Sequence, residues 1–353
     1  MLNFALVGCG KIAERHSYLL GNGLIENARL ISVCDLDIEK ADKIANQYEN
    51  INSYTDIDNM MSAEKIDVVT ILTPSGLHAL HTKDVAKYGA HIVVEKPMAL
   101  NVDDALSMIN ICEKQKINLF VIKQNRFNLP VVALKQAINN GRFGKLVMAT
   151  IRVRWSRTQD YYNQAKWRGT WAMDGGVLAN QASHHIDLLE WMMGDVESVF
   201  SLGKTALAEI ETEDTAVAVL KFKNGGLGII EATTAVRPKD LEGSISVLGE
   251  YGSVEIGGFA ANELKTWNFV NSDPNDKKIM RDFSKNPNEN GFSHRQYYNH
   301  ITDCIINDKP HLVDGHEGLK SLVLINALYE SIQTGSEIKI DLKNGFNNSK
   351  LGK

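Results

Sequence analysis

Two adjacent histidines in the segment NQASHHID, residues 180–187, are the side chains of this chain best suited to acid–base chemistry. A free imidazole is mostly neutral at pH 7 and can take up a proton. If the segment is helical, Asn180 and His184 lie four residues apart on one face and can converge on a single bound hydroxyl. Neighbouring histidines in a helix point about 100° apart and no third ligand follows at a fixed spacing, so we expect no metal here. We therefore predict a catalytic centre rather than a metal site or a plain core helix.

A glycine-rich turn, GCGKIA at residues 8–13, follows the first apolar run and has the spacing GxGxxA. Gly8 permits a tight turn, and Gly10 lets the backbone approach a pyrophosphate at the start of a helix. Asp35 ends the second apolar run, where a carboxylate accepts hydrogen bonds from both ribose hydroxyls and repels a 2′-phosphate. Residues 36–39 contain no arginine or lysine that would bind such a phosphate. The pattern predicts NAD rather than NADP.

Further candidates stand at the ends of later apolar runs, in TPSGLHALH (73–81) and VVEKPMAL (93–100). Lys96 leaves the fourth run where a bound nicotinamide is expected, and Pro97 keeps Lys96 out of helical geometry, with a cis bond as one option. A solvated lysine at a strand end is the alternative. The full set of predicted cofactor contacts is Gly8, Gly10, Lys11, Ile12, Ala13, Asp35, Thr73, Pro74, His78, Glu95, Lys96, Pro97 and Gln124.

These residues need a scaffold, and the apolar pattern predicts one with two parts. Short β-branched runs at 3–7, 30–35, 67–72, 91–95 and 118–122 alternate with helical patterns at 38–48, 77–88 and 102–115, which is typical of a doubly wound α/β Rossmann fold with a parallel sheet. After a helix at 131–140, strands and glycine turns up to residue 269 indicate antiparallel sheet. We expect a loop at 271–291 and helices at 293–307 and 315–333.

Bulk composition agrees with a two-domain soluble protein: 353 residues, 44% hydrophobic and 23% charged. We expect an NAD-binding domain over 1–123 and a second domain over 124–353 that includes the closing helices. The net charge of −5 argues against non-specific nucleic-acid binding. Four cysteines without a CxxC pair suit reduced thiols in the cytoplasm, and we expect neither a signal peptide nor a membrane span.

The blocks GCGKIA, TPSGLH, EKP and DGGVLANQASHHIDLLEWMMG, in this order, resemble the Gfo/Idh/MocA family of NAD(P)-dependent sugar and cyclitol oxidoreductases. The resemblance covers nearly the whole chain. It implies a Rossmann domain followed by an α+β domain with a large, open, mostly antiparallel sheet that often mediates oligomerisation. The family's lysine falls on Lys96, and its catalytic histidine falls on His184, not His185. Asn180 stands where many members have aspartate, and we expect Asp187 to supply the missing carboxylate support.

Longer blocks, among them VIKQNRFN and IRVRWSRTQDYYNQAKWRGTWAMD, resemble the UDP-N-acetyl-D-glucosaminuronate (UDP-GlcNAcA) 3-dehydrogenases of bacterial surface-polysaccharide pathways, which include lipopolysaccharide and O-antigen synthesis. This narrower resemblance implies NAD-dependent oxidation of the carbon-3 hydroxyl to a ketone. We favour His184 as the base and Lys96 as the group that holds the oxygen, and the two roles can be exchanged. The alternatives are a dehydrogenase of another sugar or cyclitol and a non-catalytic NAD-binding sensor.

Such a substrate carries a diphosphate and a carboxylate, so its site needs cations. Residues 150–170 contain five cations and a single acid, with aromatic side chains between them, although a solvated face of a sheet would look the same. The predicted substrate contacts are Lys96, Lys123, Arg126, Arg152, Arg154, Arg157, Tyr162, Trp167, Arg168, Asn180, His184, His294 and Tyr298. We further expect a homodimer or homotetramer, and a 2-oxo acid as a possible hydride acceptor.

Overall fold

The computed structural model describes residues 1–286, 292–341 and 346–353. It divides into two compact units. The first contains Met1–Gln124 and the described residues of 291–319, and the second contains the described residues of 125–290 and 320–353. Each unit has its own sheet. No helix in the described ranges is both long and apolar enough to cross a membrane.

The first unit contains a six-stranded parallel sheet with the order β3-β2-β1-β4-β5-β6. The strands are β1 Leu2–Val7, β2 Ala28–Cys34, β3 Asn52–Tyr54, β4 Val68–Ile71, β5 His91–Val94 and β6 Leu119–Val121. The helices between them are α1 Ala13–Gly21, α2 Ile38–Ala45, α3 Ile57–Ala63, α4 His78–Ala86 and α5 Val102–Gln115. All four residues of β4 are buried, because a parallel sheet is covered on both faces. The predicted doubly wound fold is confirmed, and its strand order reverses between β1 and β4, where ligands bind.

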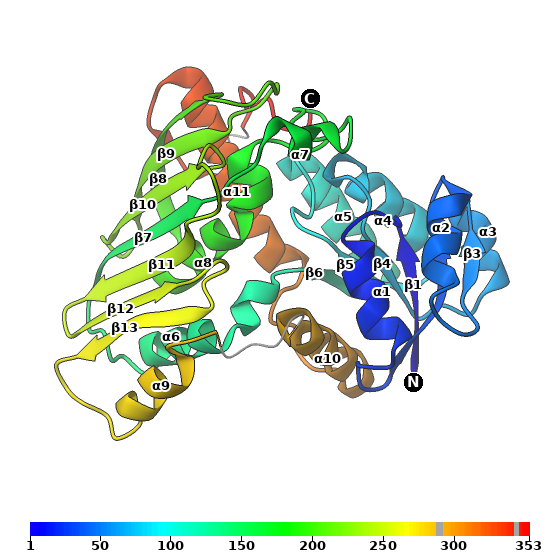
Figure 1. Ribbon diagram of the computed structural model, residues 1–353, viewed down its shortest axis with the longest axis horizontal. Coiled ribbons are helices and arrows are strands. Elements are labelled where there is room, and N and C mark those ends of the chain that lie inside the picture. The colour runs from blue at the N-terminus through cyan, green and yellow to red at the C-terminus, as the bar shows by residue number, and fades with distance from the viewer. Residues whose placement is uncertain (287–291, 342–345) are drawn as a thin grey trace. The chain divides into compact units, whose positions relative to one another are not determined.

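Helix α10, Phe292–Asn307, packs within the first unit rather than in the second domain as expected. Two tyrosines explain this. The hydroxyl of Tyr297 donates to the carbonyl of Val121 at 2.5 Å, and that of Tyr298 lies 3.2 Å from Oγ1 of Thr70. Figure 1 shows α10 beside α1. The functional division into a cofactor domain and a substrate domain stays a prediction.

The second unit contains an eight-stranded sheet with the order β13-β12-β11-β7-β10-β9-β8-β14. All neighbouring pairs are antiparallel except β7 with β10, so the predicted mostly antiparallel sheet is confirmed. Helix α8, Ser183–Met193, packs on β7 and β11 (Figure 1). The strands are β7 Leu146–Arg154, β8 Val196–Lys204, β9 Thr215–Phe222, β10 Leu227–Thr233, β11 Glu242–Gly249, β12 Gly252–Gly257, β13 Glu263–Phe269 and β14 Ile338–Lys339. The other helices are α6 Leu129–Asn139, α7 Gln159–Asn163, α9 Asp276–Phe283 and α11 Gly315–Thr334, of which α11 begins in the first unit.

The expectation of a loop over 271–291 is wrong in part, because α9 lies inside it, while 287–291 are outside the described residues. Asp276, the first residue of α9, anchors the helix to residues outside it. Its carboxylate accepts hydrogen bonds from Arg142 and from Trp267 Nε1, each at 2.7 Å. The Arg142 guanidinium outweighs burial and lowers the pKa of Asp276 to about 2. Arg142 lies 134 positions away along the chain and Trp267 lies on the preceding strand, so the composition of the segment alone does not reveal the helix.

Candidate active site

The glycine turn after β1 has the geometry that a dinucleotide pyrophosphate requires. Gly8 has φ +97°, and a Cβ there would lie 2.8 Å from the backbone of Leu72 and Thr73 at the end of β4. At Gly10, no described atom lies within 4 Å of an added Cβ, so the backbone is open to a ligand. Helix α1 begins directly after this turn, at Ala13. The residues therefore fit the pyrophosphate of NAD.

Asp35 follows β2, and the turn itself holds its carboxylate. Oδ2 accepts from the backbone N–H of Cys9 at 2.8 Å, and Oδ1 accepts from the N–H of Asp37 at 2.9 Å. A carboxylate oxygen has two acceptor sites, so both oxygens keep one for a ribose hydroxyl. The nearby Lys40 is paired with Asp37 at 3.1 Å. A fixed negative charge at this place favours NAD over NADP.

Replacing Asp35 with asparagine is expected to change the cofactor preference. Loss of the charge weakens hydrogen bonds from the ribose by about 1–2 kcal/mol, or roughly 10-fold or more in kcat/KM for NAD, and it removes the repulsion of a 2′-phosphate. Initial rates with NAD and with NADP measure the ratio. Asp103→Asn is the matched control, since that exposed carboxylate lies in the first turn of α5, belongs to no predicted contact, and should leave the ratio unchanged. An unchanged ratio in the Asp35 variant would remove Asp35 from cofactor selection.

His78, a predicted cofactor contact, connects the segments that follow β4 and β5 by hydrogen bonds. Its Nε2 lies 2.8 Å from the carbonyl oxygen of Thr73, and its Nδ1 lies 2.9 Å from that of Pro97. Burial lowers the pKa of His78, so the ring is neutral at pH 7 and donates to only one carbonyl at a time. Thr73 also bonds through Oγ1 to His81, at 2.9 Å. The role of His78 toward the cofactor stays a prediction.

Lys96 leaves β5 through a cis bond to Pro97 and is half-buried. The preceding Glu95 is 7% exposed, and its Oε2 accepts from the backbone N–H of Lys96 at 2.9 Å. Its Oε1 lies 3.1 Å from Nε2 of His16 on α1. We did not single out His16 from the sequence. Its position could have identified it, because it lies three residues after Ala13 on the helix that begins at the glycine motif.

The segment with the two histidines is not one regular helix. Residues Val177–Gln181 form a π-helical turn, in which the N–H of Ala182 donates to the carbonyl of Val177 at 2.8 Å, and α8 begins at Ser183. The expected i,i+4 pair of Asn180 and His184 on a single α-helix is therefore wrong as a geometric argument. Turns of this kind occur often at functional sites. Whether the two side chains act together stays a prediction.

The buried side chain of Asp174 supplies a carboxylate beside Asn180. Oδ1 of Asp174 accepts from the Asn180 amide, and Oδ2 accepts from the N–H of Gly169 at 2.8 Å. Sequence reasoning missed Asp174, although it opens the DGG that precedes the motif. A second missed carboxyl, Glu213, accepts from the N–H of Leu178 and from the Tyr329 hydroxyl, each at 2.9 Å. Burial raises the pKa of Glu213 to about 7 against these hydrogen bonds.

The two histidines differ in their surroundings. His185 is fully buried and contacts the ring of Trp155 edge-on, at 5.9 Å between centroids. Burial lowers its pKa to about 4, against the opposing effect of the Gly243 backbone. His185 is thus a core side chain that stays neutral at pH 7. His184 remains the candidate for proton transfer, as a prediction.

Asp187, four residues before Trp191 on α8, forms a buried ion pair with Arg126. Its two oxygens accept from Nε and Nη2 of Arg126, both at 2.9 Å, and both side chains are 3% exposed. The Arg126 guanidinium also lies over the ring of Trp191, 4.8 Å from its centroid. The expected support of His184 by Asp187 stays a prediction beside this buried ion pair. Arg126 is also one of the predicted substrate contacts, and that role stays a prediction.

Arg152 and Arg154 lie on the face of the second sheet that is opposite α8. Along β7 the residues Ile151 and Val153 are buried, and the two arginines alternate with them. Arg154 forms a bidentate pair with Glu231, at 2.6 and 2.7 Å, and a further bond to Glu242 at 3.0 Å. The structure therefore does not bring these two arginines together with His184.

The remaining predicted cations and aromatic residues form a local cluster around Tyr161. Arg168 donates to the Tyr161 hydroxyl at 2.5 Å and lies over the Trp167 ring, while Arg157 lies over the Tyr161 ring and contacts Asp240 at 3.1 Å. Tyr162 lies 3.0 Å from Oγ1 of Thr234. Lys123, in the first unit, is buried. These residues stay predicted substrate contacts.

His294 and Tyr298 lie on α10 and face His16, not an open surface of that helix. The Tyr298 hydroxyl is 2.7 Å from Nδ1 of His16, and the rings of His16 and His294 are edge-on at 5.5 Å. Ligand-type atoms of His16, Glu95 and His294 lie within 4.8 Å of one another, a spacing at which metal ligands occur. The positive charges of Arg15 and Lys96 act on the same group and oppose a cation there.

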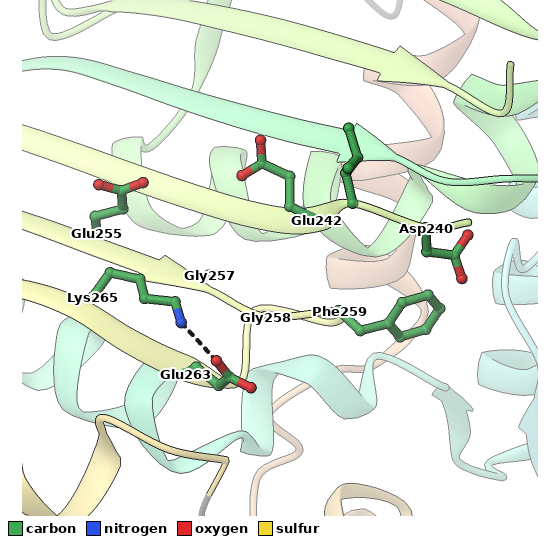
Figure 2. A pocket seen from close by; sticks show the side chains of 9 residues that line it. Asp240, Glu242, Glu255, Gly257, Gly258, Phe259, Glu263 and Lys265 are labelled. Atoms are coloured by element: carbon green, nitrogen blue, oxygen red, sulfur yellow. Dashed lines mark hydrogen bonds and ion pairs between the residues drawn. The ribbon is translucent and has the colours of Figure 1, made fainter. Parts of the chain in front are cut away.

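A pocket at the edge of the second sheet contains none of the predicted site residues. Figure 2 shows that Asp240, Glu242, Glu255 and Glu263 line it, with Lys265 bound to Glu263 at 2.7 Å. Four carboxylates and one amine repel a diphosphate. This pocket therefore does not suit an anionic nucleotide sugar.

Comparison with known proteins agrees with this architecture. Residues 2–123 match the family model described as oxidoreductase family, NAD-binding Rossmann fold, and residues 135–340 match its C-terminal alpha/beta domain. The WlbA dehydrogenase from Bordetella pertussis, crystallised with NADH and UDP-GlcNAcA, is 39% identical over 96% of this chain and 98% of its own, with a TM-score of 0.93. WlbA from Chromobacterium violaceum, with the same ligands, is 40% identical over 97% and 96%, with a TM-score of 0.91. Myo-inositol 2-dehydrogenase from Thermotoga maritima is 26% identical over 96% and 99%.

Proposed function

The chain belongs to the Gfo/Idh/MocA oxidoreductase family, as an NAD-dependent dehydrogenase of CH–OH groups, and from that premise we propose that it oxidises the carbon-3 hydroxyl of UDP-GlcNAcA to a ketone. One observation carries the choice of substrate. Two structures at 39% and 40% identity over almost the whole chain hold NADH together with UDP-GlcNAcA. The curated relative acting on myo-inositol is more distant, at 26%.

In this proposal the chain supplies three functions at the reacting carbon. His184 takes the hydroxyl proton, since a neutral imidazole is a competent base at pH 7. Lys96 holds and polarises the oxygen, and Asn180, which is fixed by Asp174, orients the hydroxyl. NAD, when bound, would supply the acceptor for a hydride from carbon 3. The residues that would hold it are the glycine turn, through backbone N–H groups, and Asp35, through the ribose.

The substrate contacts, the pathway and the cellular setting are parts of the same proposal. We assign the cation–aromatic cluster of Arg157 and Arg168 to the charged parts of the nucleotide sugar, because guanidinium groups pair well with phosphates and carboxylates. The product would enter bacterial surface-polysaccharide synthesis, with a 2-oxo acid as one acceptor that reoxidises NADH. A cytoplasmic setting fits the four cysteines, which are buried and unpaired in the described structure.

A homodimer or homotetramer is supported by the outward face of the second sheet. Phe200 on β8 pairs in register with Val219 on β9, and they are 36% and 56% exposed. Leu202 and Leu227 extend this apolar face, at 57% and 55%. A face of this kind is normally covered in a stable protein. The mass of the protein in solution tests this part.

The substrate carboxylate is expected to be required for activity. UDP-GlcNAc lacks the carboxylate, so a cation in the site would have no partner. This should cost about 3 kcal/mol or more of binding free energy, and kcat/KM for UDP-GlcNAc should be at least about 10²-fold below that for UDP-GlcNAcA. Initial rates of NADH formation with the two sugars measure this ratio. Mass spectrometry of the product should show a sugar that is lighter by two hydrogens.

Two outcomes would contradict the proposal. Equal rates with the two sugars would point to another nucleotide sugar or a cyclitol. Thermal stabilisation by NAD and the sugar without any NADH formation would favour a sensor that binds both and performs no chemistry.

A further inference from the structure

The carboxylate of Glu95 connects Lys96 to the interior of the first unit. Its Oε2 accepts the backbone N–H of Lys96 at 2.9 Å, and its Oε1 lies 3.1 Å from Nε2 of His16. Glu95 is 7% exposed and His16 is 0% exposed. A carboxylate this deep requires partners to remain charged, and here both of its oxygens have one.

A second layer holds His16 in turn. Its Nδ1 lies 2.7 Å from the hydroxyl of Tyr298 on α10, which lies 3.2 Å from Oγ1 of Thr70 on β4. Tyr298 also packs edge-on against Phe4 of β1, with ring centroids 5.7 Å apart. Both ring nitrogens of His16 are therefore engaged, and the imidazole has no freedom to turn away from Glu95. Networks that are satisfied in this way make the geometry rigid.

The groups around Glu95 favour its ionised form. The groups that face it are His16 on α1, His78 on α4, His294 on α10 and Lys96, with Arg15 close to His294. Burial alone would raise the pKa of Glu95, but the hydrogen bond and charge of His16, with help from His294 and Lys96, hold it well below the usual range. Burial lowers the pKa of His294 to about 3, and it lowers that of His78. These two imidazoles are neutral at pH 7. The Glu95 carboxylate, which accepts the backbone N–H of Lys96, also interacts electrostatically with the positive charge of that lysine.

We propose that Glu95, held in place by His16, is a positioning residue that keeps Lys96 in its ammonium form during the reaction. A carboxylate next to an amine stabilises the protonated state. Lys96 then donates a hydrogen bond to the substrate oxygen and cannot accept a proton from it. The role of base falls to His184. The inference rests on the proposed oxidation of a sugar hydroxyl.

The proton and electron balance of the step is then determined. The O–H bond at carbon 3 breaks, and its proton goes to His184. The C–H bond breaks, and the hydrogen leaves with both electrons to the bound NAD, while the carbon–oxygen double bond forms. Lys96 keeps its proton from start to finish.

A Glu95→Gln variant tests this assignment, because glutamine keeps the shape and loses the charge. In the pH profile of kcat/KM, the alkaline limb reports the loss of the Lys96 proton, and it should move down by about one to two pH units. The acid limb, which belongs to His184, should stay in place. Movement of the acid limb instead would make Lys96 the base, and a lower Tm with both limbs unmoved would make Glu95 merely structural. Either result overturns the proposal.

A second readout needs no substrate. Acetic anhydride acylates only free amines, and peptide mass spectrometry follows the labelling of Lys96 against pH in both proteins. The labelling midpoint, which is the pH at which labelling is half-maximal, should be lower for Lys96 in the Glu95→Gln variant. The midpoint of the exposed Lys65 should be the same in both proteins. Equal midpoints for Lys96 would contradict the role of Glu95. Wild-type protein that oxidises neither sugar would refute the proposed function, while the labelling would still test Glu95.

If the Glu95→Gln variant does not fold, a Tyr298→Phe variant can be used to test the proposal instead. It removes the hydroxyl next to His16 and keeps the ring against Phe4, so the alkaline limb and the Lys96 midpoint should move in the same direction by a smaller amount. No movement in this variant would count against the network. Metal analysis of the purified protein should find no stoichiometric ion. A bound transition metal that is lost in the His294→Ala variant would show that His16, Glu95 and His294 form a metal site, and it would overturn the proposal.

Discussion

Turnover of the nucleotide sugar is expected to fall by about 10²–10⁴-fold when His184 is replaced by asparagine, because the hydroxyl proton then has no acceptor of suitable pKa. Binding of NAD should hardly change, since the cofactor is held by the glycine turn and by Asp35. The effect should therefore appear in kcat more than in the KM for NAD. Initial rates of NADH formation at saturating UDP-GlcNAcA measure it.

His185→Asn is the matched control, since the same side chain is replaced one position further along α8. His185 is fully buried against Trp155 and lies in the core, so its replacement should lower the Tm and leave kcat within a few-fold. The reverse pattern, with His185 decisive for kcat and His184 dispensable, would move the catalytic role to the other histidine. Turnover of the His184 variant within a few-fold of wild type would exclude His184 from the mechanism.

Asp187→Asn is expected to lower the free energy of unfolding of the second unit by about 3–5 kcal/mol, because it removes one charge of a buried ion pair with the Arg126 guanidinium. Both side chains are 3% exposed, so water cannot compensate for the loss. All five tryptophans lie in this unit, and Trp191 is in contact with Arg126. Tryptophan fluorescence during urea unfolding therefore reports the stability of this unit.

Two further variants separate burial from charge. Glu197→Gln removes one partner of an exposed pair with Lys221, in which the side chains are 42% and 54% exposed, and should change stability by less than about 1 kcal/mol. The double variant Arg126→Met with Asp187→Leu removes both charges and should recover much of the loss. A loss below about 1 kcal/mol for Asp187→Asn would mean that the pair is not desolvated in solution.

The cofactor site could be predicted from the sequence because the residues that form it belong to one βαβ unit. Gly8 and Gly10 lie in a single turn, and Asp35 follows the second strand of that unit. The structure places them as expected, with φ +97° at Gly8 and open space at Gly10. The antiparallel second sheet was also predictable, since alternating side chains and glycine turns are properties of short segments.

The hydrogen-bond and ion-pair partners of polar side chains could not be predicted in this way. Arg126 and Arg154 were predicted as substrate contacts, and the sequence did not reveal that the structure pairs them with Asp187 and with Glu231, respectively. Asp187 lies 61 positions from Arg126, and Glu231 lies 77 positions from Arg154. A run of cations has the same composition whether it binds a ligand or an acid on the neighbouring strand.

The sequence by itself determined most of the local elements, the NAD preference and the family, but not helix α9 or the π-helical turn at Val177–Gln181. Only the tertiary structure decided that α10 packs against the first sheet, that Asp174 stands beside Asn180, and that His16 holds Glu95. The physical reason is the range of the interactions. Backbone conformation and apolar period depend on neighbours within a few residues, whereas a buried polar group is satisfied by whichever donor or acceptor folding brings to it.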